Sequence, residues 1–305
     1  MSLSADILLD RKKLKEQATR WRLLALLFIA LLAIAQLQNI SGTPHYLGGD
    51  YIARINVTDF IAEDSDRDAI LDEIAKDKHI KAVILHIDSP GGTVVGGEML
   101  YDALRRVAKV KPLVATLGTV AASGGYMTAI AADYIVSQYN TITGSVGVIL
   151  QTAEITDLAS KLGINLITIK SGKLKAIPSP FEKLTPEGQA SINDSIKESF
   201  NYFVTLVTKR RHLPDTTVSL ISDGRIFTGG QAATYHLVDA IGGEEEARKW
   251  LANTRKIPET LDVKEVLLHK KKPFWQEYTN SLIGNNILSS RFFSLDGLLA
   301  IWHPL

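Results

Sequence analysis

The chain has 305 residues, 46% of them hydrophobic, which is enough apolar material to bury a core and argues against disorder. Its 34 Lys and Arg residues are balanced by 33 Asp and Glu residues, and no long basic block is interleaved with aromatic residues, so we expect no nucleic-acid partner. The absence of cysteine excludes disulfides, thiolate metal sites and cysteine nucleophiles. We expect neither a metal nor a cofactor, and any covalent catalysis must use another residue.

The first distinctive segment is an apolar run near the N-terminus. Residues 23–35 are uninterruptedly apolar and the run extends weakly to residue 40, close to the roughly 17 to 25 residues that a membrane span needs. Six basic residues precede it: Arg11, Lys12, Lys13, Lys15, Arg20 and Arg22. The first Lys or Arg after it is Arg54, an asymmetry that favours a cytoplasmic N-terminus with the rest of the chain outside. A membrane anchor over residues 23–40 is favoured. A signal peptide cleaved after the small-x-small residues 33–35 and a buried helix are the alternatives.

Strand-like and helix-like stretches then alternate along the chain. Short runs rich in β-branched residues predict buried strands at residues 51–57, 82–88, 113–117 and 134–137. Apolar residues spaced by three and four predict helices at residues 66–77, 94–110, 124–132 and 185–210. In the last of these, Thr185 can cap the helix and Pro186 suits its first turn. Repeated β-α-β units predict an α/β fold with a parallel sheet covered by helices.

This pattern divides the chain into four regions. We expect a basic cytoplasmic N-terminus at residues 1–22, the anchor at 23–40, a catalytic domain at 41–254 and a C-terminal extension at 255–305. The extension carries a lysine run followed by an aromatic, apolar tail, and the sequence does not place it.

Two glycine-rich segments follow predicted strands. They are residues 88–92 and 121–126, and we expect both to form turns at the carboxyl ends of parallel strands, where α/β proteins bind ligands. Ser123 stands at the entry to a helix between Ala122 and Gly124, with room around its hydroxyl and backbone donors nearby for an oxyanion. The alternative is that Ser123 is an ordinary helix N-cap.

A serine nucleophile needs a base, and the sequence offers no obvious Ser-His-Asp triad. None of the seven histidines lies in a glycine-marked turn, and we expect His86, two residues before Asp88 on a predicted strand, to be a core or sheet-end residue. A lysine can serve instead if desolvation makes its neutral form available. Lys173 and Lys175 are the candidates. Spacing does not choose between them, and either could be a solvated surface residue.

Five strings together resemble the signal peptide peptidase A family. In chain order they are Asp88-Ser-Pro-Gly-Gly-Thr93, Ala122-Ser-Gly-Gly-Tyr126, Thr141-Ile-Thr-Gly-Ser-Val-Gly-Val148, Ser171-Gly-Lys-Leu-Lys175 and Asp223-Gly-Arg-Ile-Phe-Thr-Gly229. The resemblance spans roughly residues 51–250. It implies a Clp protease and crotonase type of fold, a spiral of β-β-α units, and a Ser-Lys dyad formed by Ser123 and Lys175. It also implies an oxyanion hole near Gly91, Gly92 and Gly124.

The resemblance carries functional expectations as well. It implies a short, single-copy bacterial form that hydrolyses hydrophobic peptides, such as residual signal peptides. The catalytic domain would lie on the periplasmic or extracellular side of the inner membrane, in a homo-oligomeric ring. One departure concerns Ala176, because many relatives carry an acidic residue directly after the lysine. Two other classes are a crotonase-like acyl-CoA enzyme, which normally uses carboxylates, and a non-catalytic scaffold on a peptidase fold, which Ala176 would suit.

Overall fold

The computed structural model describes residue 15 and residues 17–28, 49–268 and 299–301. Residues 17–28 are helical and exposed. Within these described ranges, no helix combines the length and apolar character needed to cross a membrane. Most of the predicted anchor at residues 23–40 lies outside the described residues.

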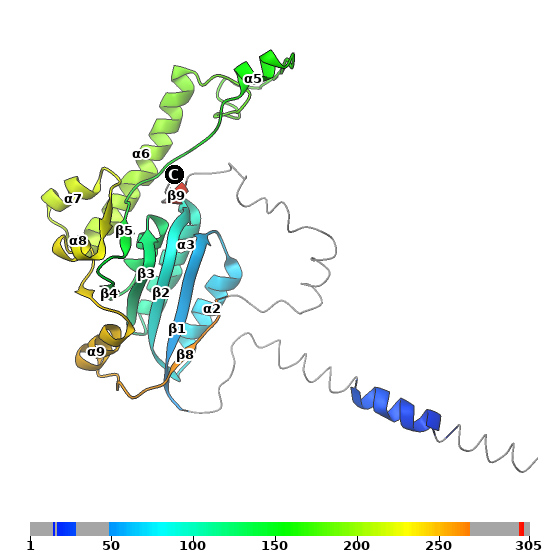
Figure 1. The fold of residues 1–305 in the computed structure, drawn as a ribbon, viewed down its shortest axis with the longest axis vertical. Helices are drawn as coiled ribbons and strands as arrows, with labels where there is room; N and C mark the ends of the chain where they lie inside the picture. Colours follow the sequence, from blue (N-terminus) through cyan, green and yellow to red (C-terminus); the bar gives the residue numbers. More distant parts are fainter. Residues whose placement is uncertain (1–14, 16, 29–48, 269–298, 302–305) are drawn as a thin grey trace, which may run out of the picture. The chain divides into compact units, whose positions relative to one another are not determined.

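A mostly parallel sheet forms the centre of the molecule (Figure 1). Its middle strands are β1 (Tyr51–Ile61), β2 (Ile80–Thr93) and β3 (Leu113–Ala122), which run parallel in the order β3-β2-β1. On the far side of β1 lies β8 (Val263–Glu265), also parallel. Nearly every residue of the three middle strands is buried or half-buried, as expected for strands covered on both faces. The prediction of an α/β fold with a parallel sheet is confirmed.

The two halves of β3 pair with different strands on the side away from β2. Residues 114–117 pair with β4 and residues 120–122 pair with β5, both in parallel. The short strands of this region are β4 (Tyr134–Ser137), β5 (Ile142–Gly144), β6 (Ile226–Thr228), antiparallel to β5, and β7 (Ala240–Ile241), parallel to β4. This branching and the repeated strand-helix units agree with the expected spiral.

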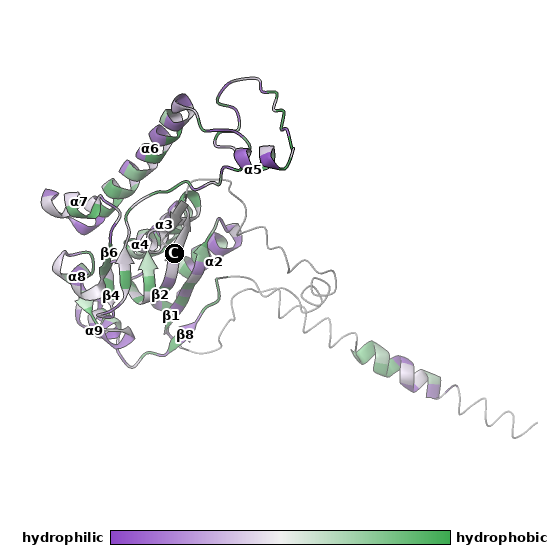
Figure 2. Cartoon of the chain, turned by 45° about the horizontal axis from the view of Figure 1, so that its top comes forward, coloured by the Kyte–Doolittle hydropathy of each residue, from purple (hydrophilic) through white to green (hydrophobic). Residues whose placement is uncertain are grey.

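Helices cover both faces of the sheet. One face packs on α2 (Ser65–Lys76), α3 (Val94–Ala108) and α4 (Gly124–Ala129), and the other packs on α9 (Glu244–Arg255). Side chains of β1 alternate between these faces, so Ala53 and Ile55 join the first core, whereas Ile52 joins the second. Figure 2 shows this as hydrophobic colour on the strands and on the sheet-facing sides of the helices.

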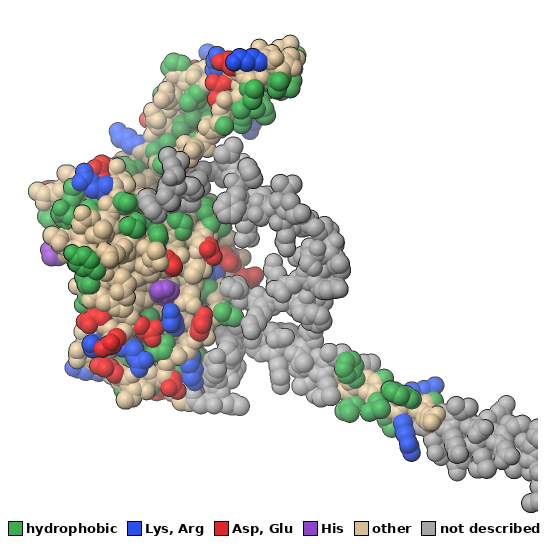
Figure 3. Space-filling view, viewed as in Figure 1, with side chains coloured by type: hydrophobic (Ala, Val, Ile, Leu, Met, Phe, Trp, Pro, Cys, Tyr) green, Lys and Arg blue, Asp and Glu red, His purple; other side chains and the backbone are tan. Residues whose placement is uncertain are grey.

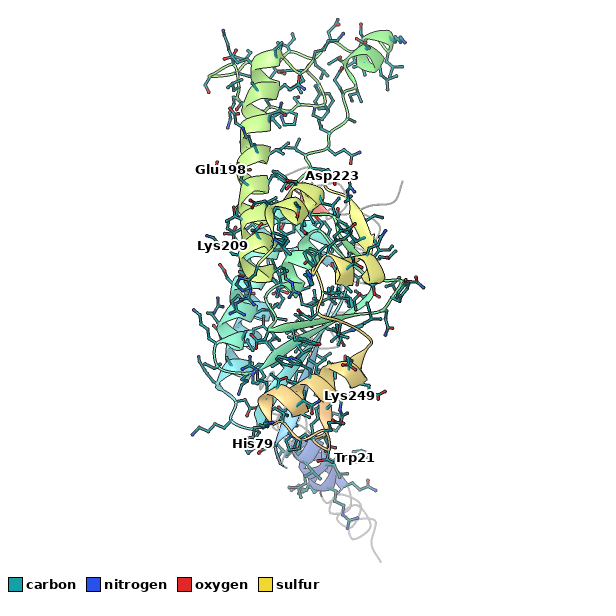
Figure 4. The ribbon with its side chains drawn as sticks, turned by 90° about the vertical axis from the view of Figure 1, so that its left-hand side faces the viewer. Trp21, His79, Glu198, Lys209, Asp223 and Lys249 are labelled. Atoms are coloured by element: carbon teal, nitrogen blue, oxygen red, sulfur yellow. The ribbon has the colours of Figure 1, made fainter. Side chains whose placement is uncertain are left out.

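The long helix α6 (Pro186–Arg211) begins as the sequence predicts. Thr185 accepts a hydrogen bond from the N–H of Gly188 at 3.1 Å, and Pro186 occupies the first turn. Its C-terminal half buries Phe203 and Val207, and Figure 4 shows the helix rising from the body near Lys209 past Glu198. Residues 150–185, which we name the projecting segment, precede it. They include α5 (Thr156–Lys161) and are mostly exposed.

Two smaller helices, α7 (Asp215–Ile221) and α8 (Gly229–Thr234), follow α6. A capping box starts α8: Thr228 accepts from the N–H of Gln231, whose side chain bonds back to the N–H of Thr228. These helices connect α6 to the last strands of the sheet.

The expectation that residues 88–92 form a turn is wrong, because β2 continues through them to Thr93. Parallel pairing with β1 persists there after a register shift, with Phe60 opposite Gly91 and Ile61 opposite Gly92. A Cβ on Gly92 would lie 1.8 Å from the carbonyl oxygen of Ile61, so only glycine allows this approach. The sequence did not place the C-terminal extension at residues 255–305. In the structure it contributes β8 and also β9 (Leu299–Ile301), which is antiparallel to the end of β2.

Candidate active site

Ser123 occupies a strained turn between β3 and α4. Its φ of 54° and ψ of −118° form a conformation that L-residues rarely adopt and that costs on the order of 1–3 kcal/mol. Its backbone N–H donates to the carbonyl of Gly144 on β5 at 2.8 Å. Its side chain makes no capping hydrogen bond, although it stands at the N-cap of α4, and the residue is 1% exposed. The alternative of an ordinary N-cap is therefore wrong, and the strained turn carries a hydroxyl that the helix does not use.

Close packing at its start holds α4 in place. A Cβ on Gly125 would come within 2.6 Å of the carbonyl oxygen of Ser89, so β2 and α4 touch through their backbones. The fully buried Tyr126 hydroxyl donates to the carbonyl of Leu237 at 2.8 Å, and burial raises the pKa of this phenol well above its usual value. The residue after Ser123 thus begins a helix with little freedom to shift.

Two arginines hold the other end of α4. Arg210 on α6 donates to the carbonyls of Ile130 and Ala132, at 2.8 Å each. Arg105 on α3 donates to the carbonyl of Ala131 at 2.7 Å. These carbonyls follow the C-terminus of α4 and have no further helical turn to bond to, and cations are favoured there. The helix behind Ser123 is therefore clamped at both ends.

The glycine segment of β2 lies beside this turn. Ser89 is buried, and its hydroxyl donates to the carbonyl of Asp59 and accepts from the N–H of Gly91, the latter at 3.1 Å. Of the three glycines expected at the oxyanion hole, Gly91 thus has its N–H bonded within the chain. Gly124 is the first residue of α4, where N–H groups have no partner inside the helix. Gly124 is therefore better placed than Gly91 to donate to an oxyanion.

A hollow of about 340 Å³ opens directly after β5, the strand whose Gly144 accepts a hydrogen bond from the N–H of Ser123. Its lining is part apolar and part polar and comes from three places: residues 145–149 directly after β5, Ile196 and Phe200 on α6, and residues 222–224. The N–H of Ser145, bonded to the carbonyl of Arg225 at 2.9 Å, fixes one wall. Such a pocket suits an apolar side chain. The residue-by-residue reading of the sequence missed it, although two of the family-like strings, 141–148 and 223–229, supply much of its wall.

The lysine candidates lie in the projecting segment. Lys175 is exposed, and only its backbone is fixed, by a bond from its N–H to the carbonyl of Gly172 at 3.1 Å. Lys173 is also exposed, whereas Lys170 is ion-paired with Glu182 and lowers the pKa of that carboxyl. Figures 1 and 4 show this part of the chain, between α5 and α6, extending beyond the sheet. Among the described residues, no hydrogen bond joins Lys175 to Ser123, which is 1% exposed.

His86 is confirmed as a sheet histidine. Its ring Nδ1 lies 3.2 Å from the Thr116 hydroxyl across the β2–β3 pair, and burial, assisted by the charge of Arg54, lowers its pKa. It lies at the middle of the strands, whereas Ser123 follows the end of β3. The residue has a structural partner and no geometric link to the candidate nucleophile.

Comparisons with known proteins show the family of the chain. Residues 105–258 match peptidase family S49. A provisionally named protease of Methanocaldococcus jannaschii is 36% identical over 250 residues, 75% of this chain and 80% of that protein. One of Synechocystis is 41% identical over 203 residues, 66% of this chain and 73% of that protein.

A third relative is a provisionally named signal peptide peptidase SppA of Enterococcus faecium. It is 35% identical over 188 residues, 61% of this chain and 55% of that protein. These relatives are named as peptidases, so neither the acyl-CoA enzyme nor the non-catalytic scaffold finds support among them. The chain belongs to peptidase family S49, in the signal peptide peptidase A family, and is a serine peptidase.

Proposed function

We propose that this peptidase is a membrane-anchored endopeptidase that cleaves hydrophobic peptides with Ser123 as nucleophile and Lys175 as general base. The observation that carries the proposal is the turn at Ser123, where a strained backbone presents a hydroxyl that caps no helix, beside the glycine strand of β2. Strain at one residue in an otherwise well-packed core is typical of a functional site. No metal or cofactor enters the reaction.

The reaction follows from the chemistry of these groups. The neutral amine of Lys175 takes the proton of the Ser123 hydroxyl while Oγ attacks the peptide carbonyl. The N–H groups of Gly92 and Gly124 hold the negative charge that develops on the carbonyl oxygen. The C–N bond then breaks, the lysine returns the proton to the leaving amine, and a Ser123 ester remains. Water, deprotonated by the same amine, hydrolyses the ester and restores both residues.

We propose that a second copy of the chain completes the dyad. Lys175 is exposed on the projecting segment, whose surface also carries many apolar side chains, visible in Figure 3. These exposed residues are Ile155, Leu158, Leu162, Ile164, Leu166, Ile167, Ile169, Leu174, Phe181 and Leu184. Ile167 and Ile169 are 86% and 94% exposed, and an apolar surface of this extent is typical of a protein contact. Packing this segment on a neighbour in a homo-oligomeric ring would desolvate Lys175, which favours its neutral form.

The proposed substrates are extended hydrophobic peptides, including residual signal peptides. The apolar part of the hollow, formed by residues 146–149, Ile196 and Phe200, suits such side chains. The basic residues before the apolar run at residues 23–40 support a single-pass anchor in the bacterial inner membrane. The N-terminus would then be cytoplasmic and the peptidase domain would lie on the periplasmic or extracellular side.

The direct test is cleavage of a hydrophobic reporter peptide by the full chain and by Ser123→Ala. We expect the substitution to abolish cleavage while the circular dichroism spectrum stays unchanged. The matched control is Ser219→Ala, at an exposed position on α7 that does not line the hollow. Retained cleavage by Ser123→Ala would show that another residue is the nucleophile.

A further inference from the structure

The strand β3 contains a bulge shortly before Ser123. Strands β2 and β3 pair in parallel up to Leu117 of β3, and pairing resumes at Ala121 after a register shift. In this interval β2 has a single residue, Asp88, whereas β3 has three, residues 118–120. Extra residues of this kind leave part of the longer strand without ladder partners and bend it. The bulge lies where β3 leaves β4 and begins to pair with β5 (Figure 1).

The carboxylate of Asp88 bonds to the backbone of this bulge. Its Oδ1 accepts a hydrogen bond from the N–H of Val120 at 2.9 Å, where a regular ladder would supply a backbone carbonyl. Gly118 leaves room for the carboxylate, because a Cβ on Gly118 would lie 3.0 Å from both Cβ and Cγ of Asp88. A backbone N–H inside a sheet needs an acceptor, and a carboxylate is a stronger one than a neutral oxygen. Asp88 therefore supplies the bond that β2 itself does not make at this position.

Two threonines hold the bulge from the side of β5. The hydroxyl of Thr141 donates to the carbonyl of Gly118, and that of Thr143 donates to the carbonyl of Ala121, at 2.7 Å each. Both threonines are buried. The backbone of the same segment accepts the N–H of Ser123. The path of β3 into the turn is thus fixed from two sides, by the β5 segment on one side and by a single carboxylate on the other.

We propose that Asp88 is a positioning residue for the nucleophile, and that it acts through its hydrogen bond to Val120. The inference rests on the proposed function, because it takes Ser123 as the residue that attacks the peptide. Without the bond, the bulge can relax along β3 and shift the Ser123 hydroxyl, which follows Val120 by three residues. A misplacement of about 1 Å at a reacting atom can slow catalysis about a hundredfold. Because Asp88 acts through the backbone of β3 and not on the peptide, its loss should lower kcat and leave KM nearly unchanged.

The kinetic test compares Asp88→Ala with Asp88→Asn in the full chain. Asparagine keeps a side-chain oxygen that can accept the N–H of Val120, whereas alanine has none. We expect Asp88→Ala to lower kcat for a hydrophobic reporter peptide about ten- to a hundredfold with little change in KM. Asp88→Asn should retain most of the kcat of the unaltered chain. An unchanged kcat in Asp88→Ala overturns the inference.

Asp88→Asn also separates the hydrogen bond from the negative charge. If Asp88 acted through its charge on the amine of Lys175, removing that charge would lower the pKa of the lysine and move the pH–rate limb to lower pH. We expect the limb of Asp88→Asn to coincide with that of the unaltered chain. A shifted limb, or an Asp88→Asn chain as slow as Asp88→Ala, would show that the bond to Val120 is not the means by which Asp88 acts.

Asp77→Ala is the matched control. The Asp77 carboxylate also accepts a backbone N–H, that of His79 at 2.8 Å, but it lies just before β2, at the opposite end of the strand from Asp88. We expect Asp77→Ala and Asp88→Ala to lower the urea midpoint to a similar extent, and only Asp88→Ala to lose kcat. Equal losses of kcat in the two variants would show that Asp88 is merely a structural residue.

Hydrogen exchange tests the role of the bond without any cleavage. Mass spectrometry of a peptide covering residues 118–123 should show faster amide exchange in Asp88→Ala, and Asp88→Asn should restore the slow exchange. Equal exchange in Asp88→Ala and the unaltered chain would contradict the proposal. If Ser123→Ala still cleaves the reporter, the proposed nucleophile is wrong, while the exchange rates still decide whether Asp88 holds the bulge.

Discussion

The backbone N–H of Ser123 donates to the carbonyl of Gly144 across 2.8 Å, and this bond ties the turn after β3 to the end of β5. Gly144 itself has a φ of 80°, and a Cβ there would come within 2.6 Å of the Phe227 ring. Two unusual backbone conformations thus support each other. The strain at Ser123 is held by a neighbouring strand and does not depend on the Ser123 side chain.

A first prediction therefore concerns the backbone at this turn. Ser123→Gly and Ser123→Ala both remove the hydroxyl and should both abolish peptide cleavage. Glycine adopts a positive φ freely, whereas alanine retains most of the strain, so Ser123→Gly should be more stable than Ser123→Ala by about 1 kcal/mol. Urea unfolding followed by circular dichroism measures the difference. Equal stabilities would mean that the turn relaxes when its side chain is shortened.

A second prediction concerns the base. Lys175→Ala should abolish cleavage, and Lys175→Arg should do nearly the same, because a guanidinium stays protonated and cannot accept a proton from serine. Lys173→Ala, two residues away on the same exposed segment, is the control and should keep its activity. The opposite pattern, with Lys173→Ala inactive and both Lys175 variants active, would show that Lys173 is the base.

A third prediction tests whether two copies share the dyad. Ser123→Ala and Lys175→Ala chains, each inactive alone, should regain activity when they are mixed and allowed to exchange subunits. With random mixing in a ring, about a quarter of the neighbouring pairs would combine an intact serine with an intact lysine. Reporter cleavage before and after mixing measures this. A mixture that exchanges subunits and stays inactive would place both residues in one chain.

A fourth prediction concerns the clamp on α4. Arg210→Ala leaves the carbonyls of Ile130 and Ala132 without their donors, which should cost about 1–3 kcal/mol. Lys209→Ala, at the exposed neighbouring position on α6, should change the free energy of unfolding by less than about 0.5 kcal/mol. Urea unfolding of both variants gives the comparison, and equal effects would show that the arginine contributes only surface charge.

A fifth prediction concerns pH and His86. Burial, assisted by Arg54, lowers the pKa of His86 from its usual 6.5, so the unfolded chain binds a proton there more readily than the folded chain. The stability that this residue contributes is complete above about pH 6.5. It is lost as the pH falls toward the folded-state pKa.

His86→Asn should therefore flatten the fall in stability on acidification, measured by urea midpoints between about pH 5 and 7. His236→Asn is the control, because His236 is exposed and asparagine tolerates its φ of 59°. Identical pH slopes for His86→Asn and the unaltered chain would show that His86 does not contribute to the pH dependence of stability.

Local patterns predicted much of this fold. The β-branched runs at residues 51–57 and 82–88 identify buried strands, and Thr185 with Pro186 marks the start of α6, because these signals arise from neighbouring residues. The extent of β2 through Gly92 was not predictable in the same way. A glycine string resembles a turn in sequence, and only the pairing with Ile61 keeps it extended.

In the candidate site, too, the features set by neighbouring residues were predictable and those set by distant contacts were not. The place of Ser123 before a helix follows from the sequence, whereas its bond to Gly144 and the hollow formed with Phe200 depend on contacts between distant segments. Residues 299–301 are the extreme case, because three apolar residues near a chain end carry no local signal for the strand they join. The exposure of Lys175 was foreseen only as the alternative of a solvated lysine.

Because the projecting segment is exposed, folding of one chain and assembly of its proposed active site are two different steps. The turn at Ser123 is built within one chain, but Lys175 stands on a surface that the same chain leaves uncovered. If a second copy completes the dyad as proposed, a newly folded copy would be latent, and cleavage would begin only when copies associate. Dilution should then abolish peptide cleavage with a steep concentration dependence while every helix and strand remains in place.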